Sequence, residues 1–442
     1  MATTYLTRTG VTPTISNKYT FSCWVKRGSI GTTETIFRTY SDSNNSAQLI
    51  FDSDDSFAFQ DIIGGTTVTN LKPSNLFRDP GAWMNIIVQV DYTQATAADR
   101  AKIFINGVEV SYSATTVQSE GGASMLNTAN NNALGSNRSN SSHYFTGSMS
   151  QVNFIDGTAY PATAFGSVNA TSGIWVANSG PTVTYGNNGF FLDMANSSDM
   201  GNDVSGKTND FTVGGGTVTQ MEDTPDNNFA TWNPLVQQSS GFVLSNGNTT
   251  ADNTNDTWRS VYSTLAPSVG KYYFECKIVN QLQTPRSIIG VCSTTQASNS
   301  SARLGYEGTN AYAYGSDGNK INNGTNTSYG STFATGDIIS CALDLDNGKI
   351  YFRKNNDAWN NSGDPTSGST GTGSAFNVTL GESYYFGSAS YGNDGIISIN
   401  SGNGYFQTTA VASAGTNASG NGVFEYDVPT GYTALSTKGL NS

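Results

Sequence analysis

Short runs of alternating apolar and polar residues recur along the whole chain. Residues 19–27, YTFSCWVKR, place Phe21, Cys23 and Val25 on one face and Trp24 on the other. Similar runs follow at intervals close to the 8–12 residues that are typical of β-sandwich strands. No long stretch shows the 3.6-residue apolar period of an amphipathic helix. The pattern predicts an all-β protein built from short strands.

Two distant segments share an unusual hairpin pattern. They read IIVQVDYTQATAADRAKIFINGVEV (86–110) and IISCALDLDNGKIYFRKNNDAW (338–359). In each, an alternating run ends in an aspartate, Asp91 or Asp344, and a turn leads into a lysine-led strand. Asn-Gly pairs, here at 106–107 and 347–348, are strong tight-turn signals. The repeat indicates one architecture used twice.

The length of the chain and its clusters of turn-forming residues predict three parts. The 442 residues suffice for two or three domains with sizeable cores, and the 49 glycines supply many turns. We expect one sandwich over residues 1–165, a connector with short strands over 166–235, and a second sandwich with a C-terminal tail over 236–442. The connector is rich in Gly, Asp and Asn, which favour turns.

The first part resembles a laminin-G-like, concanavalin-A-type jelly roll. The resemblance rests on the order of the segments FSCWVKR, WMNIIVQVD, KIFINGVEV, LGSN and FTGSMSQVNFIDG. Residues 240–407 resemble a SPRY (B30.2-like) domain through GKYYFE, IGV, the YGSDG stretch and GDIISCALDLDNGKIYF. These resemblances imply two concanavalin-A-like jelly-roll β-sandwiches joined by a turn-rich connector. A SPRY domain implies partner binding by loops at one end of the sandwich.

A third resemblance concerns the joint and the tail. The segments YGNNGFFLDM, GNDVSGKTNDFTV and DTPDNNFATWNPL, with FEYDVPTGYTALSTKGLN near the end, are similar to modules of tailed-phage and prophage proteins. This resemblance implies a bacteriophage virion protein.

Net charge and apolar content limit which partners and which location we expect for the protein. A net charge of −12 repels nucleic-acid phosphates, so we expect no nucleic-acid partner. No apolar run approaches the roughly 20 residues of a membrane helix, and the N-terminus lacks a signal-peptide core. Three of the four cysteines lie in apolar strand runs, which favours buried thiols over disulfides or a metal site. We expect a protein made in the host cytoplasm and exposed on the virion surface.

Catalytic chemistry finds little support. His143 is the only histidine, which excludes Ser-His-Asp and multi-histidine schemes, and a solvated loop residue is its expected role. Glucanases of related shape carry an E-x-D-x-x-E strand that is absent here, and the eight glutamates are well separated. We therefore predict no enzyme and no catalytic residues. A polysaccharide-cleaving enzyme is the least favoured alternative.

Metal and ligand candidates lie in loops. Asp52, Asp54 and Asp55 could bind Ca²⁺ within one turn, although an ordinary polar hairpin loop is the favoured interpretation, so no cofactor is expected. Aromatic faces and neighbouring acidic groups suit sugar rings or peptide side chains, although such aromatics at strand ends usually cap the core. The candidate ligand-binding residues are Tyr306, Tyr312, Asp357, Trp359 and Trp258.

The functional hypothesis is a tail-fibre or receptor-binding adhesin without catalysis. Its partners would be a host surface glycan or protein and other virion proteins, with a homo-oligomer inside the particle. The alternative is a capsid decoration (head-fibre) protein or a tail adaptor.

Overall fold

Strands make up nearly all of the regular secondary structure. The computed structural model describes residues 3–137, 142–236, 241–281, 286–297, 303–392 and 395–441. In these ranges the α-helices are only α1 (Thr294–Ala297) and α2 (Thr437–Leu440), and the 3₁₀ turns are η1 (Ala97–Asp99), η2 (Ala162–Ala164), η3 (Asn360–Ser362) and η4 (Gly368–Thr370). The all-β prediction is confirmed. The chain divides into unit 1, Met1–Gln220, and unit 2, Met221–Ser442.

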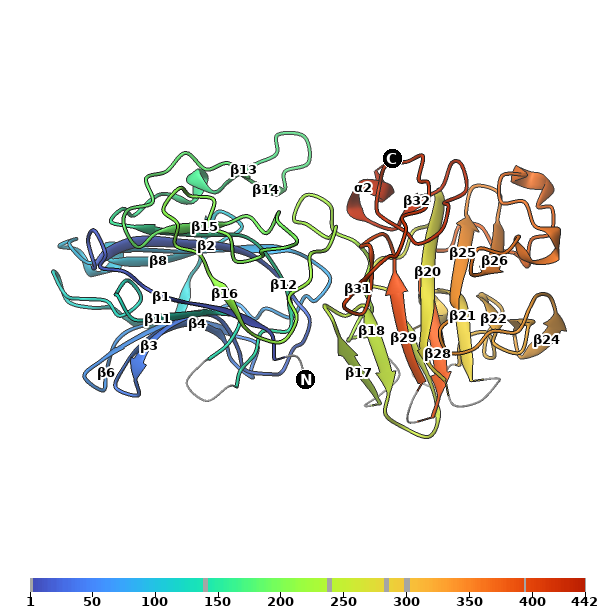
Figure 1. Cartoon of the computed structure of the whole chain (residues 1–442), viewed down its shortest axis with the longest axis horizontal. Helices are drawn as coiled ribbons and strands as arrows, with labels where there is room; N and C mark the ends of the chain where they lie inside the picture. The colour runs from blue at the N-terminus through green and yellow to red at the C-terminus, as the bar shows by residue number, and fades with distance from the viewer. Residues whose placement is uncertain are drawn as a thin grey trace. The chain divides into compact units, whose positions relative to one another are not determined.

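Unit 1 is a sandwich of two antiparallel sheets, visible as two layers of blue to green strands in Figure 1. The eight-stranded sheet runs β10 (Tyr112–Thr116), β6 (Thr66–Pro73), β5 (Phe57–Ile63), β4 (Asn45–Phe51), β3 (Glu34–Asp42), β11 (Asn131–Leu134), β1 (Tyr5–Thr9), β16 (Thr212–Gly215). The six-stranded sheet runs β15 (Phe190–Leu192), β12 (Gly147–Asp156), β2 (Lys18–Arg27), β7 (Met84–Asp91), β8 (Ala101–Ile105), β9 (Val108–Glu109). A separate pair comprises β13 (Gly166–Val168) and β14 (Trp175–Ala177).

The inward face of β2 builds the core of unit 1 as the alternation predicts. Phe21, Cys23 and Val25 belong to the buried cluster between the sheets, and Phe21 stacks on Phe37 of the other sheet at a centroid distance of 5.3 Å. Trp24 on the opposite face is also buried, at 3% exposure. The outer face of this sheet is covered by a second apolar cluster that includes Phe165. The strand is therefore buried on both sides.

The expected connector does not form a separate part. β15 pairs with β12 and β16 pairs with β1, so residues 190–215 complete the two sheets of unit 1. Trp232, expected at the end of the connector, is fully buried in the core of unit 2. The boundary between the units lies at residues 220 and 221. Turn-forming residues mark this stretch, but its short apolar segments are strands of unit 1.

Unit 2 is a second sandwich, drawn from yellow-green to red in Figure 1. Its larger sheet runs β17 (Phe242–Ser245), β18 (Thr250–Asn253), β29 (Gly395–Asn400), β20 (Lys271–Asn280), β25 (Ile338–Asp344), β26 (Lys349–Lys354), β27 (Phe376–Asn377), and β32 (Thr433–Ala434) pairs with β20 in parallel. The six-stranded sheet runs β19 (Trp258–Tyr262), β28 (Tyr384–Tyr391), β21 (Ser287–Ser293), β22 (Ala311–Gly315), β23 (Asn319–Asn322), β24 (Thr325–Ser328). β30 (Tyr405–Phe406) pairs with β31 (Thr409–Ala410).

Aromatic stacking also joins the sheets of unit 2. Phe274 of β20 stacks on Phe386 of β28 at a centroid distance of 4.0 Å. Its neighbours Tyr273 and Glu275 point to the outer face, where the segment around Phe424 covers them. On the outer face of the six-stranded sheet, Leu304 packs against small residues of the strands. Both outer faces of unit 2 therefore carry buried apolar clusters.

The two Asn-Gly pairs lie in turns of different length. Asn106 and Gly107 both have positive φ, 49° and 78°, and join β8 to β9 as the two-residue turn that the sequence predicts. In unit 2, four residues (345–348) join β25 to β26, and among them only Gly348 has a positive φ, 64°. The Asn-Gly pair at 347–348 therefore closes a longer loop rather than a two-residue turn.

Candidate functional site

Two aromatic residues stand side by side at one end of the six-stranded sheet of unit 2. Trp258 begins the edge strand β19, Tyr391 ends β28, and the two are register partners. Their rings meet edge-on with centroids 5.6 Å apart. Alternation places Trp258 with Tyr262 on the outer face of the sheet. Both aromatic residues are half-buried and keep part of their surface in solvent.

Arg303 lies between Trp258 and Tyr306. Its guanidinium carbon is 3.5 Å from the centroid of each ring. Burial lowers the pKa of Arg303, while Tyr306 and Glu307 oppose that shift. An arginine keeps its charge in proteins, so a cation is held between two aromatic faces. The hydroxyl of Tyr306 donates to Asn326 at 3.2 Å, which fixes the far ring.

A second arginine extends the group. The guanidinium carbon of Arg286 is 4.5 Å from the centroid of the Tyr391 ring. Arg286 immediately precedes β21, which neighbours β28 in the sheet. We name the set the aromatic–arginine cluster: Trp258, Tyr306, Tyr391, Arg286 and Arg303. Each member is half-buried, and Trp, Tyr and Arg are the residues enriched at the energetic centres of protein interfaces.

Of the five candidate ligand-binding residues, only Trp258 and Tyr306 come together. Tyr312 is a core residue at 5% exposure, with its ring 5.5 Å from that of Phe376 and its hydroxyl bonded to Thr379. The sequence predicts a loop at Tyr312, but residues 311–315 form strand β22, whose alternation turns Tyr312 inward and Ala313 outward. Tyr312 is therefore not available to a ligand in this structure.

Trp359 and Asp357 belong to the other sheet. Trp359 packs on the outer face of the eight-stranded sheet, edge-on to Tyr351 at 6.4 Å and 4.8 Å from the guanidinium carbon of Arg353. Asp357 is exposed in the turn after β26, where its N–H donates to the carbonyl of Lys354 at 3.0 Å. These two residues do not join the aromatic–arginine cluster.

The three candidate calcium ligands are already paired with cations of the protein. Asp55 contacts Arg27 at 3.1 Å and Arg78 at 3.0 Å, while Lys72 lies 3.2 Å from Asp54 and 3.5 Å from Asp52. Hydrogen bonds from Ser56, with help from Lys72, lower the pKa of Asp54 to about 2. Among the described residues, no group of three or more His, Cys, Asp or Glu side chains is arranged to hold a metal ion. The favoured interpretation, a polar loop, agrees with these pairings.

The cysteines and the histidine lie where the sequence predicts. All four cysteines are free and buried, and burial raises the pKa of Cys292 to about 12. Buried thiols with such pKa values are inert side chains. His143 is exposed, and its Nδ1 is 3.0 Å from the amide nitrogen of Asn137. No long apolar helix capable of crossing a membrane occurs within the described ranges.

Sequence reasoning missed the buried carboxyl group of Glu275. It is fully buried on the outer face of β20 and accepts hydrogen bonds from the N–H groups of Glu425 and Tyr426, at 2.9 and 2.8 Å. Tyr273 and Asn400 donate to the same carboxylate, at 3.0 and 3.2 Å. The GKYYFE motif contains this residue, but the two backbone N–H groups that it accepts from lie 150 and 151 positions away. The group anchors the C-terminal segment to the sheet.

Comparisons with known proteins identify two domains in the chain. Residues 2–163 match the family model described as the Concanavalin A-like lectin/glucanases superfamily, and residues 271–364 match the SPRY domain model. Over 93 residues the chain is 33% identical to Ran-binding protein 9 of Danio rerio and 34% identical to Ran-binding protein 9 of Homo sapiens. These matches cover 21% of this chain but only 15% and 12% of the relatives' lengths. A similar solved structure is the SPRY domain of human HERC1, with 19% identity and a TM-score of 0.32, covering 38% of this chain and 96% of that one.

The two domain resemblances are confirmed, and the phage hypothesis is not. The curated relatives include Ran-binding proteins 9 and 10 of animals rather than phage proteins, so the tail-fibre adhesin and its location in the virion are contradicted. That hypothesis rested on the joint and the tail. In the structure these segments are ordinary parts of the two sandwiches: β15 lies in the joint, and β32 in the tail.

Proposed function

We propose that unit 2 is a non-catalytic protein-binding module and that it contacts its partner through the aromatic–arginine cluster. The observation that carries the proposal is the guanidinium of Arg303 held 3.5 Å from two half-buried rings. This stacking orders the arginine before a partner arrives, which lowers the entropic cost of binding. The names of the curated relatives describe protein binding, and we carry over that class of activity rather than their partner.

The cluster favours a peptide segment that carries a carboxylate beside an apolar side chain. Two guanidinium groups present planar donor arrays that suit carboxylates. The exposed parts of Trp258 and Tyr391 offer flat apolar surfaces next to these donors. The chain's net charge of −12 would repel an acidic segment, so local contacts with the two arginines must outweigh the long-range field.

The test is selection of a yeast-displayed random dodecapeptide library on the full chain. We expect enrichment of peptides with an acidic residue near an aromatic or aliphatic one. Trp258→Ala should weaken the selected peptides about 30-fold, because truncating an interface hot spot costs about 2 kcal/mol or more. Trp359→Ala is the matched control, since it removes a half-buried tryptophan from the other sheet and should leave affinity unchanged.

Two outcomes would overturn the proposal. The first is a selection that enriches nothing above the level of an unrelated bait. The second is a set of enriched peptides whose affinity survives Trp258→Ala, or falls equally in Trp359→Ala.

A further inference from the structure

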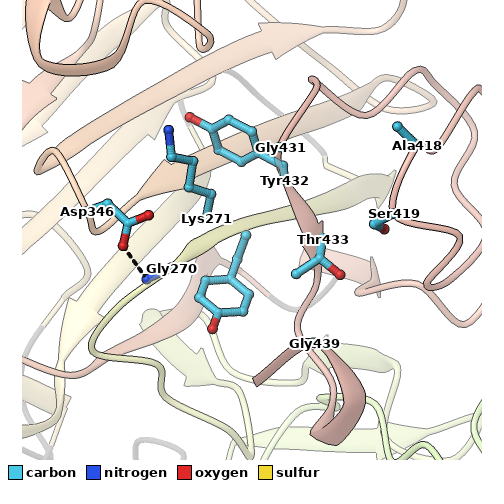
Figure 2. A pocket seen from close by; sticks show the side chains of 10 residues that line it. Gly270, Lys271, Asp346, Ala418, Ser419, Gly431, Tyr432, Thr433 and Gly439 are labelled. Atoms are coloured by element: carbon cyan, nitrogen blue, oxygen red, sulfur yellow. Dashed lines mark hydrogen bonds between the residues drawn. The ribbon is translucent and has the colours of Figure 1, made fainter. Parts of the chain in front are cut away.

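A pocket of mixed polar and apolar lining lies in unit 2, and it shares no residue with the aromatic–arginine cluster. It is a hollow of about 340 Å³ between the start of β20, the loop after β25 and the C-terminal segment. Figure 2 shows Lys271 and Asp346 on one side of the hollow, and Thr433 and Ser419 on the other. The volume is at the lower end of the range of small-molecule sites, which is about 300–1,000 Å³.

The hydroxyl of Tyr272 has no protein partner there. Tyr272 lines the pocket and is only 3% exposed, and within the described residues no group hydrogen-bonds its phenol oxygen. Gly270 makes room for the ring, because a Cβ at that position would lie 2.9 Å from the phenol oxygen. The hydroxyl is open to the pocket, so a molecule that occupies the pocket can hydrogen-bond it as donor or acceptor.

The charges around the pocket disfavour an anion. Lys271 is neutralised by Asp344 at 3.0 Å. Asp346 adds a further carboxylate, which accepts the N–H of Gly270 at 2.8 Å through one oxygen (Figure 2). The three charged groups therefore sum to one negative charge, and a phosphate or carboxylate ligand would be repelled.

The remaining donors and acceptors suit hydroxyl groups. Thr433 accepts from Asn421 at 2.9 Å and keeps its own proton to donate. Ser419 donates to Asn417 at 2.7 Å and accepts the N–H of Asn421 at 3.2 Å, which leaves its oxygen one lone pair to accept from a ligand. The second oxygen of Asp346 can accept, and the ammonium of Lys271 has three protons of which the ion pair uses one. A ligand hydroxyl both donates and accepts, so neighbouring hydroxyls can satisfy all of these groups.

We infer that this pocket binds a neutral polyhydroxylated small molecule, of the size and chemistry of a single hexose. The site uses Tyr272, Lys271 and Asp346 on one wall and Thr433 on the other. It is independent of the aromatic–arginine cluster, so either site can be tested without the other.

The test uses the full chain and three named probes, D-glucose, D-galactose and D-mannose, followed by saturation-transfer NMR and calorimetry. We expect at least one hexose to bind with a dissociation constant of about 1 mM, as expected for one small neutral ligand. Tyr272→Phe and Asp346→Ala should each weaken binding about tenfold, because each removes one ligand hydrogen bond. Tyr306→Phe and Asp357→Ala are matched controls outside the pocket and should bind as the wild type does. Thermal melting of each variant shows that the fold persists.

The inference is overturned if none of the three hexoses binds saturably up to about 50 mM. It is also overturned if both pocket variants retain full binding, or if inorganic phosphate binds in place of the hexoses. Should one pocket variant fail to fold, the other decides alone.

Discussion

Asp344 forms an ion pair of 3.0 Å with Lys271, its register partner across β25 and β20. The same carboxylate accepts the N–H groups of Asp346 and Asn347, at 3.0 and 2.9 Å. One side chain thus joins two strands and starts the loop that closes the hairpin. Its side chain is 1% exposed, so these contacts are shielded from water.

Unit 1 repeats this arrangement, and the pair gives a matched prediction. Lys18 and Asp91 are register partners with an ion pair of 2.9 Å, and the side chain of Asp91 is 12% exposed. We expect Asp344→Ala to lower the free energy of unfolding by about 2–3 kcal/mol and Asp91→Ala by about 1–2 kcal/mol. Asp344 is the more buried of the two, so water can less easily replace it as the acceptor for the N–H groups that lose their partner. Urea denaturation of both variants measures the difference. Asp357→Ala, in an exposed turn, should change it by less than about 0.5 kcal/mol, and equal losses in all three variants would contradict the argument.

The inner faces of the sheets could be predicted from the sequence, whereas the outer faces could not. Alternation is a local property, so Phe21 and Phe274 were assignable to strand interiors, and both stack across a sandwich. Trp24 and Tyr273 are also buried, and Tyr273 packs on the outer face of β20 against Phe424, 151 residues later in the chain. Nothing near these residues in the sequence signals that covering.

The candidate site was predicted only in part, for a related reason. Trp258 and Tyr306 stood out because aromatic residues in polar stretches are conspicuous. The cation between them, Arg303, comes from the segment that covers the outer face, 45 residues after Trp258. The only local signal is its spacing of three residues from Tyr306. Tyr312 lies in a polar, Gly-rich stretch like that of Tyr306, and so short a run does not reveal whether it is a loop or a strand. Residues 311–315 form strand β22, and the side chain of Tyr312 points into the core.

The buried carboxyl of Glu275 predicts a pH dependence. Burial raises its pKa from 4.5 to about 7, despite the four hydrogen bonds that its carboxylate accepts. Because the folded-state pKa lies above the unfolded value, its stabilising contribution is complete below about pH 4.5 and is lost as the pH rises through about 7. The free energy of unfolding should therefore fall by up to about 3 kcal/mol over that window.

Comparing the wild type with Glu275→Gln isolates this effect. Burial also raises the pKa of two carboxyl groups in unit 1, Glu34 and Asp61, the latter to about 6, so the wild type contains three contributions of the same sign. Urea denaturation at pH 4.5, 6 and 7.5 should show a shallower pH slope for Glu275→Gln than for the wild type. Parallel slopes would show that the proton does not reside on Glu275.

Calcium should not stabilise unit 1. Asp52, Asp54 and Asp55 are engaged by Lys72, Arg27 and Arg78, and a cation would have to displace these partners. We expect the melting temperature in about 5 mM CaCl₂ to match that in EDTA, since a ligand stabilises only the state it binds. A saturable rise in melting temperature that disappears in Asp54→Asn would contradict this expectation.

Gly107 should be costlier to replace than Gly64, another positive-φ turn glycine of unit 1. Its φ of 78° already disfavours a side chain, and a Cβ would lie 2.4 Å from the ring of Trp175. Gly64 is the matched control, because its φ is also positive, 58°, and no atom lies within 4 Å of its Cβ position. We expect Gly64→Ala to cost about 1 kcal/mol, from backbone strain alone. Gly107→Ala should cost about 2–3 kcal/mol, because the ring of Trp175 must also move. In a Trp175→Ala background the two glycine substitutions should cost the same amount, and if the difference between them persists there, the contact with Trp175 is not its cause.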